Sequence, residues 1–256
     1  MILTLAQIQV FTLVFARIAG LFGQAAFFSF RTIPNTPKIA ICFFITVVIW
    51  FVVPVPQNLP NNFLVFIIAL LQEYLIGRLI GFVSFIIVKA ILAAGDMMGM
   101  QMGLSVANQY DPSQGLQLNI VGRFFDFSSL IFFLCIDGHI MLITALQKSF
   151  TAIPIYSPVN IAAPMMHIVG LGTILWELSV LLAAPVILTI FLMDFAFGTI
   201  SRVAPQVNVF MLGFQIKPLL GMLTLFLMMP LLLWRIVEVM NTILEKIIGL
   251  LGYLTI

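Results

Sequence analysis

The sequence predicts an all-α membrane protein, and three observations lead to this class. Hydrophobic residues make up 62% of the chain and charged residues only 8%, whereas soluble domains carry about 25% charged residues. Several apolar runs approach the roughly 20 residues that a helix needs to cross a bilayer. Prolines and polar residues separate these runs. The 256 residues contain no separate soluble stretch, so we expect a single polytopic domain, residues 1–256.

The first three apolar segments run from about Leu5 to Phe30, Ile39 to Val53 and Phe63 to Ala94. The first has no basic region or cleavage pattern at its start, so we expect it to be retained as a membrane helix. Pro34 and Pro54 follow the first and second segments, as prolines do where helices end. As helices, the second and third segments would measure about 22 Å and about 48 Å, against a hydrocarbon core of about 30 Å. Tilting, kinking or packing against protein would accommodate these lengths.

Three more apolar segments follow. They run from about Phe127 to Leu146, Met165 to Met193 and Leu219 to Val239. Pro154 precedes the fifth segment, Pro205 and Pro218 precede the sixth, and a short apolar tail follows Ile243. The chain is therefore expected to form about six long helices, some of them kinked or of unusual length.

The composition argues against several classes of function. The net charge of +2 comes from isolated charges, so there is no basic patch for nucleic acid. Cys42 and Cys135 are too few for a disulfide framework or a zinc ribbon. Cys135 and His139 could share a helix face, but two ligands do not make a zinc site. We expect no metal, no cofactor and no catalytic residues.

Several charged residues lie in or beside apolar segments, where an ionised side chain costs about 2.5–3.5 kcal/mol at the bilayer centre. The candidates for a polar stripe or for contacts between subunits are Glu73, Arg78, Lys89, Asp96, Arg123, Asp126 and Asp137. Arg78, Lys89 and Asp96 fall on one line of a helix. Asp126 and Asp137 fall on another, and Arg123 could pair with Asp126. Such charges either pair across helices and specify packing or line a transport path.

The stretch from Gly95 to Gly103 holds four methionines and three glycines in nine residues. Glycines at every fourth position leave one helix face bare, so Gly95, Gly99 and Gly103 are expected to allow close packing. Methionine is a flexible apolar filler. The candidates for a soft gasket, or for plain packing, are Met97, Met98, Met100 and Met102.

Two other functions fit parts of the sequence. The embedded Glu73, Arg78, Lys89 and Glu177 would suit a small-solute or ion transporter, although no internal repeat is visible. An intramembrane aspartyl protease would use embedded acids such as Asp96. The Ala-Ala-Gly-Asp sequence that ends at Asp96 lacks the first glycine of the Gly-x-Gly-Asp pattern of that class, which makes the protease the weaker alternative.

Several motifs, in order along the chain, resemble those of one protein family. They are Phe15-Ala16-Arg17-Ile18 with Gly20, Gln101-Met102-Gly103-Leu104-Ser105-Val106-Ala107 with Asp111-Pro112, Gly138-His139, and Arg202-Val203-Ala204-Pro205-Gln206-Val207-Asn208-Val209-Phe210 with Gly213. Over nearly the whole chain, this ordered set resembles the FliR family of flagellar type III export components, which is related to the SctT family of injectisomes. Two positions depart from the family pattern: Asp137 stands where asparagine is expected, and Gln215 where proline is usual.

The resemblance implies a non-enzymatic, pore-forming subunit of the flagellar export gate, which passes unfolded flagellar proteins across the bacterial inner membrane at the basal body. It implies a helical hetero-oligomer of one copy of this chain with five FliP-like and four FliQ-like subunits, with an FlhB-like protein at the base. The implied fold is a FliP-like part, residues 1–164, joined to a FliQ-like helical hairpin, residues 165–256. The turn of this hairpin is expected at Arg202, Pro205, Gln206, Asn208 and Gly213.

Residues 103–118, here called the gate segment, are expected to project into the pore and plug it at rest. Gly103, Pro112 and Gly115 interrupt a helix, and the polar side chains between them could face water inside an apolar tube. The residues expected to form the plug are Gly103, Leu104, Ser105, Asn108, Asp111, Pro112 and Gly115. An ordinary loop between helices would have a similar composition.

Overall fold

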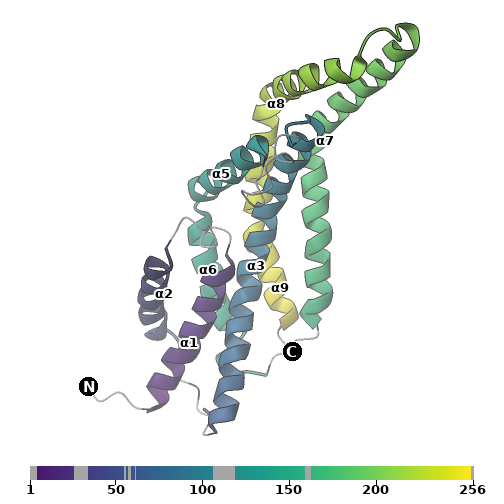
Figure 1. The fold of residues 1–256 in the computed structure, drawn as a ribbon. Coiled ribbons are helices and arrows are strands. Elements are labelled where there is room, and N and C mark those ends of the chain that lie inside the picture. The colour runs from purple at the N-terminus through teal and green to yellow at the C-terminus, as the bar shows by residue number, and fades with distance from the viewer. Residues whose placement is uncertain are drawn as a thin grey trace. The chain divides into compact units, whose positions relative to one another are not determined.

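The computed structural model describes residues 5–25, 34–54, 56, 59–60, 62–105, 119–158 and 163–254. All regular elements in these ranges are helices (Figure 1). Their bounds are α1 Leu5–Gln24, α2 Asn35–Trp50, α3 Phe63–Gln101, α5 Ile120–Cys135, α6 Gly138–Ala152, α7 Ala163–Val203, α8 Val209–Asn241 and α9 Ile243–Leu254. The all-α class predicted from the sequence is confirmed.

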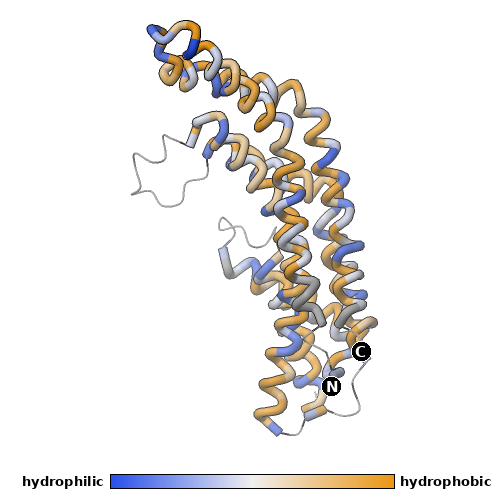
Figure 2. The backbone as a smooth tube through the Cα atoms, turned by 90° about the vertical axis from the view of Figure 1, so that its right-hand side faces the viewer, coloured by the Kyte–Doolittle hydropathy of each residue, from blue (hydrophilic) through white to orange (hydrophobic). Residues whose placement is uncertain are grey.

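Four helical stretches among the described residues are long and apolar enough to cross a membrane. They comprise α1, α3, Val169–Val203 of α7, and a stretch from Val209 to Gly252 through α8 and α9. A fifth span is obtained if α5 and α6 together count as one. Figure 2 shows that hydrophobic residues prevail along the helices and that hydrophilic residues are scattered among them. The chain therefore has the helices of a multi-pass membrane protein.

The expected helix from Phe127 to Leu146 is broken at Asp137 into α5 and α6. The prediction that Asp126 and Asp137 share one helical line is therefore wrong. Asp137 has a left-handed backbone, with φ 57° and ψ 32°, which cannot continue a right-handed helix. Asparagine and aspartate adopt this conformation more readily than other residues with a side chain. The asparagine expected from the family resemblance would suit the same backbone.

The last two long helices extend beyond their expected limits. α7 continues past Met193 to Val203, and α8 begins at Val209, so the expected break at Pro218 is wrong. Pro218 and Pro230 lie inside α8. A proline removes one N–H from the helix and disfavours the preceding turn, but apolar membrane helices tolerate this loss.

The chain folds into two compact units. Unit 1 comprises Met1–Ile87, Phe133–Gly172 and Asn241–Ile256, and unit 2 comprises Val88–Phe132 and Thr173–Met240.

In unit 1, α1 and α3 touch through their backbones. Gly20 of α1 faces the carbonyl oxygen of Tyr74, and Gly77 of α3 faces that of Arg17. A Cβ atom at either glycine would collide with the facing oxygen. The glycines therefore allow a closer approach than any residue with a side chain would permit.

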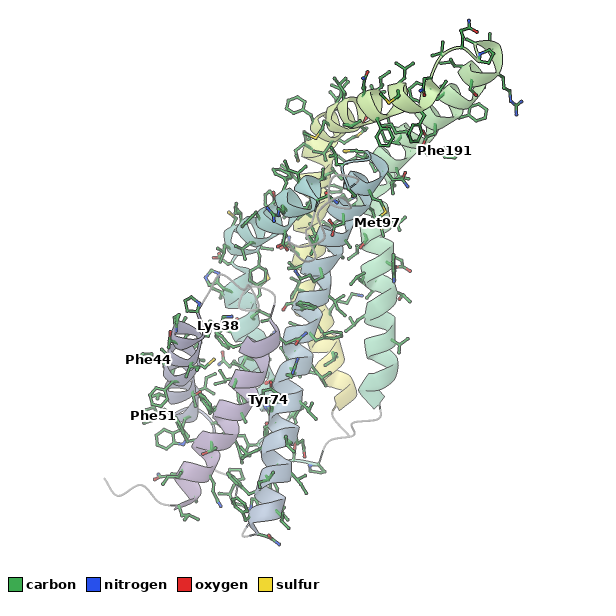
Figure 3. All side chains as sticks on the ribbon, viewed as in Figure 1. Lys38, Phe44, Phe51, Tyr74, Met97 and Phe191 are labelled. Atoms are coloured by element: carbon green, nitrogen blue, oxygen red, sulfur yellow. The ribbon has the colours of Figure 1, made fainter. Side chains whose placement is uncertain are left out.

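Two shorter helices complete unit 1. Phe11 of α1 makes edge-to-face contacts with Phe43 and Trp50 of α2, at ring-centroid distances of 5.8 and 6.0 Å, a geometry that aromatic pairs favour. Phe44 of α2 and Phe51, the residue that follows the end of α2, are both exposed and are labelled in Figure 3. α9 packs against α6. The buried side chains of α9 include Ile243, Ile247, Leu250 and Leu251.

In unit 2, α7 and α8 form an antiparallel hairpin (Figure 1). The Ser179 hydroxyl of α7 donates a hydrogen bond of 3.0 Å to the Ala90 carbonyl of α3, so the two helices lie side by side there. Ala183, Val186 and Ile190 continue the buried side of α7. Beyond Ile190 most residues of α7 are exposed.

The left-handed backbone at Asp137 makes this position selective. Asp137→Asn is expected to leave the free energy of unfolding nearly unchanged, whereas Asp137→Val should lower it by about 1–2 kcal/mol because a β-branched side chain is strained at positive φ. Unfolding of the purified protein in mixed micelles, followed by circular dichroism, measures both. Cys135→Val, which places the same β-branched residue at an exposed position in the right-handed helix α5, is the control and should cost little. Equal stability of the Asp137→Asn and Asp137→Val variants would contradict this account.

Candidate functional site

Gly103 ends α3 and begins the gate segment. Its φ of 78° is in the left-handed region, which glycine enters without strain. The Leu104 N–H donates to the Gly99 carbonyl and the Gly103 N–H to the Met100 carbonyl, both at 3.0 Å. This pair of bonds is the Schellman motif, which satisfies carbonyls left free at a helix C-terminus. The helix α3 therefore ends at a defined position, just before Gly103.

The gate segment is described only at its beginning. Gly103, Leu104 and Ser105 form a half-buried turn. The other residues expected in the plug, Asn108, Asp111, Pro112 and Gly115, lie outside the described residues.

Asn119 stands at the other end of the gate segment and caps α5. Its Oδ1 accepts a 2.8 Å hydrogen bond from the Gly122 N–H, as an N-cap side chain does for the third residue of a helix. Its Nδ2 donates to both the backbone oxygen and Oδ1 of Asp96, at 3.1 and 3.0 Å. Asn119 is 6% exposed. One buried side chain thus joins the start of α5 to the last turns of α3.

Sequence reasoning did not select Asn119. The signal for it was present, because asparagine directly before an apolar run is a common N-cap. Its second role, the contact with Asp96, depends on which helices meet and has no local signature.

The glycines before the gate segment make room for α5. A Cβ at Gly95 would lie 3.0 Å from both the Gly122 Cα and the Phe125 Cβ, and a Cβ at Gly99 would collide with the Asn119 side chain. Gly103 differs, because a Cβ there would meet no atom of the described residues within 4 Å. The helix end uses the backbone conformation of Gly103 and not its lack of bulk, and the expectation that Gly103 also serves packing stays a prediction.

The four methionines have different surroundings. Met98 and Met102 are fully buried, Met97 (labelled in Figure 3) is half-buried, and Met100 is 68% exposed. Met102 lies against Gly221 of α8, where a Cβ would be 2.9 Å from the methionine sulfur. Met98 and Met102 therefore fill the core of unit 2.

A groove of about 550 Å³ lies beside this end of α3 in unit 2. Its walls include Met100–Gly103, Phe197 of α7 and Phe214 of α8. The Lys217 ammonium of α8 lies 2.5 Å from the Asp194 carboxylate of α7 in the same groove. This ion pair connects the two helices of a largely apolar hairpin.

The expected polar stripe of α3 meets other parts of the same chain. In unit 1, the Arg78 guanidinium donates to Gln24 at 2.6 Å. In unit 2, the Lys89 ammonium lies 3.5 Å from the Asp126 carboxylate, and Asp96 accepts from Asn119. Asp126 is thus paired with Lys89, not with Arg123 as expected from the local spacing.

Among the described residues of unit 1, the most deeply buried charges are Arg17 and Glu73. Arg17 of α1 is 0% exposed, and its Nε lies 2.6 Å from Oε2 of Glu73 on α3. Its Nη1 donates to the carbonyls of Ser149 and Ile153, each at 3.0 Å, and the guanidinium stacks 4.3 Å above the Phe150 ring. The ion pair therefore connects α1 and α3 with the end of α6.

Glu73 uses its second oxygen as well. Oε1 accepts a 3.2 Å hydrogen bond from the backbone N–H of Tyr156, in the turn that follows α6. Glu73 was among the expected charged residues, whereas Arg17 entered only as part of a motif. An arginine within the first apolar run was the available signal, because an embedded cation requires an acid.

The turn between α7 and α8 contains most residues expected there. Arg202 occupies the last turn of α7, where a cation complements the helix dipole, and Pro205 and Gln206 lie in the turn itself. Oδ1 of Asn208 accepts from the Met211 N–H at 3.2 Å and caps α8. Gly213 is buried inside α8, so its expected place in the turn is wrong. A Cβ at Gly213 would lie 3.9 Å from the Phe197 ring, an ordinary van der Waals distance, so α7 and α8 do not need a glycine at this position.

Comparison with known proteins places these features in a family. A model of the family described as bacterial export proteins, family 1, matches residues 8–243. The chain is 33% identical over 222 residues to the flagellar biosynthetic protein FliR of Pectobacterium carotovorum subsp. carotovorum, covering 85% of this chain and 83% of that protein. It is 28% identical over 249 residues to FliR of Bacillus subtilis (strain 168), covering 94% of each. The surface presentation of antigens protein SpaR of Shigella flexneri is 28% identical over 156 residues, or 61% of this chain and 60% of that protein.

Removing only one partner of the Arg17–Glu73 ion pair should strongly destabilise the protein. Glu73→Leu alone is expected to lower the free energy of unfolding by about 3–5 kcal/mol, because it leaves a buried guanidinium without its carboxylate. The double variant Arg17→Leu/Glu73→Leu should lose less, since it removes both charges. Arg235→Ala, in the exposed Arg235–Glu238 pair, should cost at most about 1 kcal/mol. Unfolding in mixed micelles gives all three values, and a double variant less stable than Glu73→Leu would refute this prediction.

Asn119 should control the order of the start of α5. Asn119→Ala is expected to cost about 0.5–2 kcal/mol through loss of the cap and to speed amide hydrogen exchange at Val121 and Gly122. Asn119→Asp keeps the cap acceptor but places a second carboxylate beside Asp96, so it should weaken the contact with α3 while protecting Gly122. Hydrogen–deuterium exchange with mass spectrometry resolves the two effects. Unchanged exchange in Asn119→Ala would show that the cap is dispensable.

Proposed function

Because this chain belongs to family 1 of the bacterial export proteins, as a FliR-type component of flagellar type III export, we propose that it is a pore-forming subunit of the export gate. In this role it passes unfolded flagellar proteins across the inner membrane and resides, as a multi-pass protein, in the flagellar basal body. It is not proposed to catalyse a reaction.

The observation that best supports a gating role is the way in which both ends of the gate segment are held. Gly103 stops α3 with a Schellman motif, and Asn119 caps α5 while bonding to Asp96. The segment between them thus starts and ends on helices that are joined to each other by a buried side chain. A polar plug needs such fixed supports, because a loop with mobile ends would not hold a seal. The plug comprises residues 103–118.

Only part of the methionine set is suited to a gasket. Met97 and Met100 retain exposed surface, whereas Met98 and Met102 are buried in unit 2. The gasket therefore comprises Met97 and Met100, whose flexible thioethers can adapt to a passing chain. Met98 and Met102 support α3 from behind.

A hetero-oligomer accounts for the exposed apolar surface of the α7–α8 hairpin. Phe191, labelled in Figure 3, is 64% exposed, and Phe195, Phe210 and Phe226 are also exposed. Patches of large apolar side chains mark contacts with protein or lipid. One copy of this chain joins five FliP-like and four FliQ-like subunits, with an FlhB-like protein at the base. Residues 1–164 form its FliP-like part and residues 165–256 its FliQ-like hairpin.

Three of the four embedded charges that would suit a solute transporter give it little support, and Glu177 is the fourth. Glu73, Arg78 and Lys89 each have a partner within the chain, as charges that specify packing do. A transport path would need such groups to face a shared aqueous cavity.

The plug is tested by replacing residues 106–118 with a short Gly/Ser linker, which leaves Gly103 and Asn119 in place. The complex with FliP-like and FliQ-like subunits is reconstituted into liposomes, and its ion conductance is measured. We expect the leak to rise well above that of the unaltered complex, because the polar obstruction is gone. The control replaces the α7–α8 turn, residues 204–207, with a Gly/Ser linker and should leave conductance unchanged. An assembled linker variant with an unchanged leak would show that the segment is an ordinary connector.

A further inference from the structure

Glu177 of α7 is a charged residue that unit 2 does not neutralise. It is exposed, and its side chain has no hydrogen bond or ion pair within the part of the chain that the structure describes. The other acids among the described residues of the unit have partners: Asp126 pairs with Lys89, Asp194 with Lys217, and Asp96 accepts from Asn119. Glu238 also pairs, with Arg235. Glu177 is the exception.

The surroundings of Glu177 make this exception informative. Residues at helical spacing on the same side of α7 are Val180, Leu181, Ala184 and Leu188, all of them exposed. At 100° per residue they lie with Glu177 within an arc of about 100°. Leu181 is 54% and Leu188 is 63% exposed. We call this set, Glu177 included, the α7 stripe.

An apolar stripe with one carboxylate fits one kind of neighbour. Lipid would leave the ionised group at a cost of about 2.5–3.5 kcal/mol near the bilayer centre. An apolar helix would cover the leucines but bury the charge unpaired, which is also unfavourable. A helix whose apolar face carries a single lysine or arginine satisfies both parts of the stripe, because cation and carboxylate then neutralise each other among apolar side chains.

We infer that the α7 stripe is a contact surface for a helix of another subunit, and that this helix pairs a lysine or arginine with Glu177. The inference rests on the proposed hetero-oligomeric assembly but not on the plug. It names Glu177 as the residue that specifies how the neighbour docks, because the apolar side chains alone would allow the helix to slide.

The contact is tested first by photo-crosslinking in the assembled complex. p-Benzoylphenylalanine is placed at Leu181, in the stripe, and at Leu182, which is 1% exposed and faces the core of unit 2. We expect Leu181 to yield a covalent product with another subunit and Leu182 to yield none. Mass spectrometry of the linked peptide should show a lysine or arginine within an apolar helical sequence. A product with lipid alone, or a linked helix without a basic residue, overturns the inference.

The charge is tested by reversal. Glu177→Lys should lower the yield of the complex that contains the cross-linked subunit at least tenfold, and Glu177→Gln should lower it less. Changing the partner's basic residue to glutamate should restore assembly with Glu177→Lys and not with the original chain. Glu245→Lys, at an exposed acid of α9, is the control and should assemble normally. Circular dichroism of each purified variant confirms that helix content is retained.

Two results separate this inference from the proposed function. If the unaltered chain assembles with no FliP-like or FliQ-like subunit, the proposed function and the inference both fail. If it assembles and Glu177→Lys assembles equally well, only the inference fails.

Discussion

The requirement that embedded charges be neutralised determines which helices of this protein meet. The Arg17–Glu73 ion pair is the clearest case, since a guanidinium with no solvent exposure is held by a carboxylate, two carbonyls and an aromatic ring. The hydrophobic effect brings apolar helices together without selecting partners or register, because one leucine face resembles another. A buried charge has only a few acceptable positions. Around Arg17 these positions join α1, α3 and the end of α6.

The same rule operates in unit 2 with weaker groups. Asp96 and Asn119 hold the end of α3 to the start of α5, and Gly95 and Gly99 provide the space for this contact. Polar bonds and bare backbone thus act together, since the asparagine could not reach Asp96 past a side chain at position 99. Export requires a passage that opens for a polypeptide and closes against ions. Firm supports on both sides of a short polar segment suit that requirement if the segment is the plug we propose.

Much of the fold could be predicted from the sequence, since hydropathy and proline positions identify apolar helices. The limits of these helices could not be predicted in the same way, as α8 shows. A proline usually breaks a helix in a soluble protein, but Pro218 lies within α8. Asp137 illustrates the opposite case, where one residue in a left-handed conformation divides a continuous apolar run. For the candidate site, the sequence pointed to Gly103 and the methionines by their residue types. It did not predict the long-range contacts that hold the surrounding helices. Arg17 pairs with Glu73, 56 residues away in the sequence, and Asn119 bonds to Asp96, 23 residues away. A local sequence pattern cannot predict contacts between residues so far apart.

The glycine contacts also determine which substitutions of this protein a second substitution can compensate. Opposite Gly77 lies the backbone oxygen of Arg17, whereas opposite Gly221 lies the flexible side chain of Met102. A larger residue at position 221 could be accommodated if evolution shortened Met102. A backbone carbonyl cannot be shortened by any substitution. A larger residue at position 77 would therefore collide with the Arg17 carbonyl, and no substitution of Arg17 could relieve that collision. Suppressor substitutions would have to arise at other positions and allow α1 and α3 to separate. Because such suppressors should be rare, we expect the α1–α3 crossing to be among the slowest parts of this chain to diverge in sequence.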